Sequence, residues 1–353
     1  MHLLETSVRR QRPGPRRAPG VTVAVALLAA SCQFGVSPSG GSANPGASGS
    51  SGPGRTGAGA TIAASPGATP LSSADAAGRI VFIRFEPAKH FFVIHTIRPD
   101  GSEIRDPLPG YPLGFGLVRW SADGSRIMAQ STSTDGFETI IPPDPNKHHH
   151  LYLADPKFRF ACSAWSPTLE VLACEGWSTT EPGKEGIYTV RVADGGDVRR
   201  LTSTVDGIHD IPGDYSPDGS KLLFVRATRV PELLGQLWVC DADGGNATHI
   251  TDALSGYRVS WSPDGRWIAG TRRGSILVFD MQHLNQEPLI IGVANGTAAG
   301  PRWAPDSQHI VFQFTDSVTH ATRLEIIDSQ GLDRRQLTAG PDDESPDWGV
   351  PGF

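Results

Sequence analysis

Residues 259–270 read Val-Ser-Trp-Ser-Pro-Asp-Gly-Arg-Trp-Ile-Ala-Gly, and this stretch decides the fold because altered copies of it recur along the chain. In each copy an aromatic residue precedes a short turn sequence and then an apolar, strand-like run. The copies begin at Trp120, Trp165, Tyr215, Trp261 and Trp303, and a truncated copy begins at Trp348. A spacing of 42 to 50 residues with strand-like runs inside it is typical of propeller blades.

The sequence of each unit has a physical basis. In the Ser-Pro-Asp-Gly turn that begins at Ser262, proline presets φ, aspartate bonds back to the backbone and glycine accepts a positive φ. Alternating apolar runs such as 221–226 predict a second strand, and runs such as 237–241 predict a third strand that ends in an acidic turn. Segments such as 334–338 predict a fourth. Four short strands per unit make one blade.

The two ends of the repeat region are complementary. The unit at Trp348 has only its first strand, whereas the segments 79–84, 92–98 and 103–105 supply only the second, third and fourth strands of a blade. We therefore expect the segment that ends at Trp348 to provide the innermost strand of the N-terminal blade. The expected fold is all-β: six four-stranded antiparallel blades in residues 78–353, with the ring closed by one shared blade. Closure removes exposed sheet edges.

These repeats resemble the TolB-type β-propeller repeat of bacteria, also known as the PD40 or WD40-like repeat, over residues 78–353. The resemblance implies a six-bladed propeller. Two units depart from the pattern: the unit at Trp165 lacks the Asp-Gly pair, and the unit at Trp120 contains an insertion around residues 140–150. TolB also carries an N-terminal α/β domain where this chain has a linker, so the role of TolB in the cell envelope is not transferred to it.

The N-terminus resembles an export signal. Residues 1–20 are basic and rich in proline, residues 21–30 are apolar, and small residues then lead to Cys32. This arrangement predicts a signal peptide of the lipoprotein type over residues 1–31, with Cys32 as the lipidated residue. Ala29 departs from the commonest lipobox, so ordinary signal cleavage is one alternative. A disordered basic tail without a targeting role is the other.

Residues 32–77 predict a disordered linker, because a Gly/Ser/Ala/Pro composition buries too little apolar surface to offset chain entropy. As a flexible coil the linker reaches roughly 35–40 Å. No run of 18 apolar residues occurs, so we expect membrane attachment through the lipid alone. The expected location is the outer face of the cytoplasmic membrane, the periplasm or the cell envelope. The net charge of −6, with a basic N-terminus, leaves an acidic body and argues against nucleic acid as a partner.

The most promising binding residues belong to segments that enter the innermost strands. Such segments lie near one mouth of the central channel, where rigid strands hold loops in place for ligands. The non-functional alternative is solvated loop charge. The predicted channel-mouth residues are His209, Asp210, Asp214, Tyr257, Arg258, Arg302, Asp343 and Glu344.

The cysteines and the histidine run are weaker signals. If Trp165 pairs with Val171 across its hairpin, Cys162 and Cys174 face each other on one blade, and either a disulfide or two free thiols fit the pattern. Cys240 lies in an apolar strand and is expected to be a buried thiol. The run 147–150 (Lys-His-His-His) predicts a polar loop rather than a metal site, because adjacent strand residues point to opposite faces.

Two functional hypotheses follow. The first is a scaffold or adaptor, not an enzyme, that binds a protein or cell-wall component at the channel mouth. The chain contains no Gly-x-Ser-x-Gly motif, phosphate loop, zinc-spaced set or dinucleotide fingerprint, and its end at Phe353 leaves no room for a hydrolase domain, so we expect neither catalytic residues nor a cofactor or metal. The alternative is an enzyme or carbohydrate-binding protein acting on an extracellular polysaccharide through His209, Asp210 and Asp343.

Overall fold

The computed structural model describes residues 78–132, 138–142, 144–152, 157–168, 170–178, 180–205, 207–228, 234–340 and 342–350. The predicted signal peptide, the lipidation site at Cys32 and the predicted linker lie outside these residues. Within them, none of the helical structure is long and apolar enough to cross a membrane.

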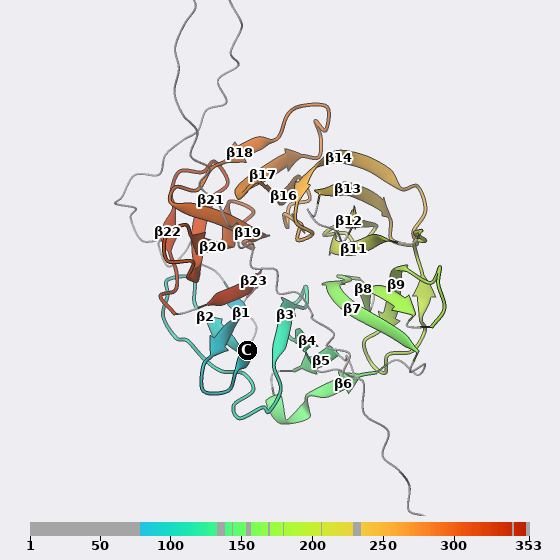
Figure 1. The fold of residues 1–353 in the computed structure, drawn as a ribbon, viewed down its shortest axis with the longest axis horizontal. Helices are drawn as coiled ribbons and strands as arrows, with labels where there is room; N and C mark the ends of the chain where they lie inside the picture. The colour runs from blue at the N-terminus through green and yellow to red at the C-terminus, as the bar shows by residue number, and fades with distance from the viewer. Residues whose placement is uncertain are drawn as a thin grey trace, which may run out of the picture. The chain divides into compact units, whose positions relative to one another are not determined.

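The described residues form six antiparallel sheets arranged in a ring, with the innermost strand of each facing the centre (Figure 1). We number five of them blades 1 to 5 in chain order and call the sixth the closing blade. Blade 1 also contains a short 3₁₀ turn, Pro145–Lys147. The strands of the closing blade are β23 (Asp343–Gly349), β1 (Arg79–Glu86) and β2 (Phe91–Ile97), and those of blade 1 are β3 (Phe115–Trp120), β4 (Ile127–Ser131), β5 (Glu138–Ile141) and β6 (His149–Leu151). Blade 2 consists of β7 (Phe158–Trp165), β8 (Val171–Ser178), β9 (Gly186–Arg191) and β10 (Arg199–Arg200), and blade 3 of β11 (Ile208–Tyr215), β12 (Lys221–Thr228), β13 (Leu234–Asp241) and β14 (Thr248–Ser255). Blade 4 consists of β15 (Ser260–Trp261), β16 (Trp267–Arg272), β17 (Ser275–Asp280) and β18 (Leu289–Ile291), and blade 5 of β19 (Gly296–Trp303), β20 (His309–Asp316), β21 (Thr322–Asp328) and β22 (Arg335–Gln336).

The closing blade joins the two ends of the repeat region, and this confirms the predicted six-bladed closure. Strand β23 pairs with β1 so that Trp348 lies opposite Ile80, and β1 pairs in turn with β2. The fourth strand expected at residues 103–105 is reduced to a single bridge between Thr96 and Arg105. Glu103 takes a positive φ of 51°, which interrupts the extended backbone that a strand needs.

The repeated aromatic residues hold neighbouring blades together. Trp261 shares a buried apolar cluster with Leu223 and Leu237 of blade 3, the blade that precedes its own. Trp348 likewise packs with Val311 and other buried residues of blade 5. Consecutive innermost strands contact each other all the way round, in the order β3, β7, β11, β15, β19, β23 and back to β3. The period of the sequence is therefore the period of the inter-blade packing.

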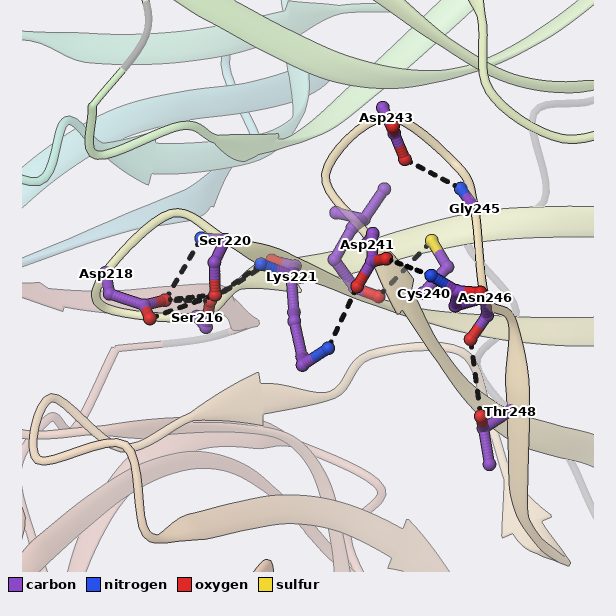
Figure 2. A network of polar contacts seen from close by, with 11 residues as sticks. Ser216, Asp218, Ser220, Lys221, Cys240, Asp241, Asp243, Gly245, Asn246 and Thr248 are labelled. Atoms are coloured by element: carbon purple, nitrogen blue, oxygen red, sulfur yellow. Dashed lines mark hydrogen bonds and ion pairs between the residues drawn. The ribbon is translucent and has the colours of Figure 1, made fainter.

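The Ser-Pro-Asp-Gly turn is built as its sequence predicts (Figure 2). In blade 3 the Ser216 hydroxyl and the Ser220 amide both donate to Asp218 Oδ1, at 2.6 and 3.0 Å. The Lys221 amide donates to Ser216 Oγ, and Gly219 takes a φ of 70°. Hydrogen bonds from the Ser216 hydroxyl and then from Ser220 lower the pKa of Asp218 to about 2. The carboxylate of Asp218 is therefore bound by hydrogen bonds from residues of its own turn.

A second acidic turn lies at the same end of the blade, between the third and fourth strands. Asp241 accepts hydrogen bonds from Lys221 Nζ at 2.9 Å and from Asn246 Nδ2 at 2.6 Å (Figure 2). The serine-to-aspartate bond of the first turn recurs in two other blades, at Ser121–Asp123 and Ser262–Asp264. The acidic residues of these turns are therefore structural.

Candidate functional site: the axial channel

The direction of the innermost strands defines two ends of the ring. In blades 1 to 5 the innermost strand ends at its aromatic residue, directly before the first turn of the blade, and in the closing blade β23 ends one residue after Trp348. We call that end the turn end, and the end where the innermost strands begin the loop end. Because the strands of a blade alternate in direction, the turns between third and fourth strands also lie at the turn end.

At the loop end, two of the predicted carboxylates are held inside their own blades. Asp210 accepts two hydrogen bonds from Arg226, at 2.7 and 2.8 Å, and the two residues are direct cross-strand partners. Asp343 accepts two from Arg84, at 2.6 and 2.9 Å, in the equivalent position of the closing blade. Both aspartates are fully buried. Each arginine therefore neutralises one carboxylate in a bidentate pair.

The remaining loop-end residues are half-buried. His209 of blade 3 contacts Glu175 of blade 2, with Nδ1 and Oε1 2.8 Å apart, so it links two blades. The Arg258 guanidinium lies 6.0 Å from the centroid of the Tyr257 ring. Burial raises the pKa of Glu344, and the positive charge of Arg258 partly opposes that shift. The loop end thus presents an aromatic ring and charges of both signs on a rigid ring of strands.

A second set of charges lies near the turn end of the innermost strands. Arg302 pairs with Asp347 through Nε at 2.6 Å and with Asp214 through Nη2 at 3.2 Å. The two carboxylates also accept backbone hydrogen bonds, Asp347 from the Trp120 amide and Asp214 from the Trp261 amide. We call Arg119, Asp214, Arg302 and Asp347 the axial charge network. It connects strands β3, β11, β15, β19 and β23, which come from five of the six sheets.

The electrostatics of the network follow from its burial. Burial lowers the pKa of Arg302, but Asp214 and Asp347 outweigh that effect and the net shift is upward. Burial raises the pKa of Asp214, against the opposing charge of Arg302. Arg119 differs, since burial first and the charge of Arg302 second lower its pKa to about 9. All of the arginines remain charged at neutral pH.

Comparison with known proteins places the chain in a family. A family model described as PD40, TolB beta propeller domain, matches residues 118–352. The chain belongs to the TolB β-propeller family. A search of curated protein sequences finds no match.

Three solved structures illustrate how widely this fold occurs. TolB from Acinetobacter baumannii is 18% identical, with a TM-score of 0.60 over 78% of this chain and 67% of that chain. A structure of a nidogen/laminin complex matches at 10% identity and a TM-score of 0.59, over 78% of this chain and 99% of that chain. A puromycin hydrolase matches at 15% identity and a TM-score of 0.52, over 76% of this chain and 53% of that chain. At these identities the likeness shows the fold alone.

The TolB-type repeat explains how the axial network could have been found in the sequence. The four members of the network each directly precede the repeated aromatic residue of an innermost strand: Arg119, Asp214, Arg302 and Asp347. Sequence reasoning assigned Asp214 and Arg302 to the channel mouth with the other six residues and missed the other two members. The structure separates Asp214 and Arg302 from the loop end, because each is the second-to-last residue of its innermost strand, next to the aromatic residue at the turn end.

The histidine run of this TolB-type propeller divides between two faces, as expected for adjacent strand residues. His148 and His150 lie on one side with ring centroids 5.6 Å apart, and Tyr111 packs against both. His149 Nε2 lies instead 3.2 Å from the Val192 carbonyl oxygen. In the part of the chain that the structure describes, no group of three or more His, Cys, Asp or Glu residues is arranged to hold a metal ion.

The structure joins Cys162 and Cys174 in a disulfide between β7 and β8. The register differs from the one considered above, because Trp165 lies opposite Leu172 rather than Val171. A register shift after Cys162 compensates for this difference and keeps the two cysteines opposite each other. Cys240 is a buried free thiol whose pKa burial raises to about 12.

Proposed function

We propose that this TolB-type propeller is an exported, lipid-anchored scaffold that binds a protein partner at the loop end of its channel. The observation that carries the proposal is the partial burial and mixed charge of the loop-end side chains. Tyr257, Arg258 and Glu344 form a half-buried patch with an aromatic ring and both signs of charge, held by strands whose positions the ring fixes. Aromatic residues and arginine are the side chains most often dominant in protein interfaces.

Polysaccharide catalysis or binding through His209, Asp210 and Asp343 receives no support from the geometry. Asp210 and Asp343 are fully buried in two different blades, and each is bound by an arginine of its own blade. His209 pairs with Glu175. A catalytic acid–base pair needs carboxyl groups that reach the same substrate bond. Here the three side chains are directed to three separate partners.

Export is supported by two independent features. Residues 1–31 have the layout of a signal peptide, with Cys32 where a lipidated residue is expected. The Cys162–Cys174 disulfide suits an oxidising compartment such as the periplasm or the outer face of the cytoplasmic membrane. The predicted linker over residues 32–77 would hold the propeller near the membrane, where it could meet a partner.

The binding proposal is tested by affinity capture from a chemically cross-linked cell envelope with the full chain as bait. Arg258→Glu reverses one loop-end charge, and Arg191→Glu is the matched control, because its exposed ion pair with Asp194 lies at the turn end. We expect a defined protein partner that the wild type and Arg191→Glu retain and Arg258→Glu loses. A partner retained equally by all three, recovery of glycan only, or recovery of no protein contradicts the proposal.

The anchor proposal is tested separately. Cys32→Ser should abolish metabolic labelling with radioactive palmitate and move the protein from the membrane fraction to the soluble fraction. Unchanged labelling, or an unchanged membrane fraction, would exclude lipidation at Cys32 as the means of attachment.

A further inference from the structure

Three arginines belong to the loop end of blade 4. Arg258 lies in the segment that leads into β15, and Arg272 and Arg273 lie at the turn between β16 and β17. Arg272 and Arg273 are exposed, and Arg258 is half-buried. In the part of the chain that the structure describes, none of their three guanidinium groups forms an ion pair or a hydrogen bond. These groups therefore remain available to a partner, on a protein whose net charge is −6.

Contacts with two other segments fix the turn that carries Arg272 and Arg273. The Arg273 amide donates a hydrogen bond to Ser255 Oγ at 3.1 Å, in the segment that leads from blade 3 to blade 4. The Gly274 carbonyl oxygen accepts one from the Ala298 amide of blade 5 at 2.8 Å. The turn is therefore attached to two neighbouring segments, and its backbone presents the two arginines from a fixed position.

Arg258 is held against the same strand of blade 5. A Cβ atom added to Gly300 would lie 3.3 Å from Arg258 Cδ, so the arginine side chain packs directly over that glycine. The Arg258 guanidinium lies 6.0 Å from the centroid of the Tyr257 ring. Because the segments 255–258 and 272–275 both contact β19, and contact each other through Ser255, they form one surface. We call Tyr257, Arg258, Arg272 and Arg273 the basic patch.

The backbone at Arg273 carries a conformational cost. Arg272 lies opposite Ser275, so the turn consists of two residues, Arg273 and Gly274, and both take a positive φ, of 50° and 77°. Such two-residue turns favour Asn, Asp or Gly at the first position, because other side chains fit a left-handed backbone poorly. Within the described residues, no ion pair, hydrogen bond or ring contact of the Arg273 side chain offsets that cost. Strain of this kind, held in place by its surroundings, is common where a side chain has a binding role.

The patch is positive whatever the ionisation of its acidic neighbour. Glu344 of the closing blade interacts electrostatically with Arg258, and it carries one negative charge when ionised. Three arginines outnumber that single carboxylate. Asp316, at the loop end of blade 5, already pairs with Arg323 through Nη1 at 3.9 Å. A ligand of the patch is therefore expected to carry negative charge.

Carboxylate side chains of a protein segment fit the patch better than a lipid surface does. A guanidinium binds a carboxylate in a fork geometry that depends on direction, and arginines on a fixed backbone can use it. The Tyr257 ring adds apolar contact area for the segment that carries the carboxylates. Attraction to anionic lipid needs no such geometry and typically uses about four to eight basic residues. This patch has three arginines, and the protein that carries it is acidic.

We propose that the basic patch binds an acidic segment of the partner protein, one with several Asp or Glu side chains close together. This assignment rests on the proposed function, which places a protein partner at the loop end, and it adds the chemistry of that partner. It also extends the binding surface from Tyr257 and Arg258 to the turn between β16 and β17.

The test is fluorescence anisotropy of a rhodamine-labelled peptide, Gly-Asp-Glu-Asp-Glu-Gly-amide, titrated with the full chain at low ionic strength. The same peptide with Asn and Gln in place of Asp and Glu is the control probe. The double variant Arg272→Gln/Arg273→Gln removes two charges of the patch, and Arg199→Gln/Arg200→Gln removes two from the outer strand of blade 2. All four residues are exposed, so both variants should keep the fold.

We expect saturable binding of the acidic peptide that the Asn/Gln peptide does not show and that weakens as salt is added. Loss of two exposed arginine–carboxylate pairs should weaken binding about five-fold in Arg272→Gln/Arg273→Gln. Binding by Arg199→Gln/Arg200→Gln should equal that of the wild type. No saturable binding, equal binding of the two peptides, or an equal loss in the two double variants overturns the proposal.

Two further measurements separate the proposal from its alternatives. Binding to phosphatidylglycerol vesicles but not to phosphatidylcholine vesicles, lost in Arg272→Gln/Arg273→Gln and without binding of the peptide, overturns it in favour of a membrane surface. The affinity capture with Arg258→Glu tests the proposed function. A partner captured through Arg258 while the acidic peptide fails to bind overturns only the acidic-segment proposal. Peptide binding without a captured partner supports the patch and contradicts only the proposed function.

Discussion

Arg302 is the residue whose removal should cost the propeller most among its charged side chains. Arg302→Gln leaves Asp214 and Asp347 without their shared cation, while each keeps one backbone hydrogen bond. Removing one partner of a buried ion pair costs about 3–5 kcal/mol, and the retained backbone bonds favour the lower end, about 3 kcal/mol. For a domain of this size each kcal/mol lowers the melting temperature by roughly 2–4 °C. The expected loss is therefore roughly 6–12 °C.

The assay is urea unfolding at pH 7 followed by tryptophan fluorescence, with thermal unfolding alongside. Arg126→Gln is the matched control: its partner Glu170 has a side chain that is 67% exposed, so the loss should stay below about 1 kcal/mol. Burial already raises the pKa of Asp214, and removing Arg302 should raise it further. A carboxyl whose folded pKa is raised destabilises the fold when ionised, so the deficit of Arg302→Gln should shrink as the pH falls through that pKa. Equal losses in the two variants would refute the reasoning.

Three further predictions concern the disulfide, the free thiol and the acidic turns. Reduction of Cys162–Cys174 should lower the unfolding free energy by roughly 3 kcal/mol, since the bond closes a loop of 12 residues, and an unchanged urea midpoint in reductant would contradict this. Cys240 has a pKa raised to about 12, so it should resist labelling of the native protein by iodoacetamide at pH 8, as read by peptide mapping. Rapid labelling of the native protein would contradict this. The side chains of Asp194 and Asp218 should titrate near pH 2 by NMR. Because their folded pKa values are lowered, their contribution to stability is present above about pH 4 and is lost as the pH falls toward 2, whereas a stability that does not change over that window would contradict it.

The fold was predictable because its determinants are local. The turn chemistry at Ser216–Gly219 and the regular return of the aromatic residues specify the blade and its repeat without knowledge of distant contacts. The shared blade followed from the missing strands at the two ends of the repeat region. The strand expected at residues 103–105 did not form because Glu103 adopts a left-handed backbone conformation, which cannot be predicted from a glutamate at that position.

The candidate site was less predictable because its pairings depend on strand register and on contacts between blades. Asp210 and Asp343 lie within β11 and β23, and the arginine that pairs with each one lies opposite it in the next strand of the same sheet. Aligning the repeats on their aromatic residues would have revealed Arg119 and Asp347 beside Asp214. Which arginine takes which aspartate still depends on how the blades meet at the axis, and that information is absent from any single repeat.

The central claim, that the loop end binds a protein partner, is tested most directly by site-specific photo-cross-linking in the cells that produce the protein. p-Benzoylphenylalanine replaces Tyr257 at the loop end in one variant and the exposed Ala247 at the turn end in the other. The account predicts a discrete protein adduct from position 257 that is absent from position 247. Adducts from position 247 alone, the same adducts from both positions, or no adduct from position 257 would contradict it.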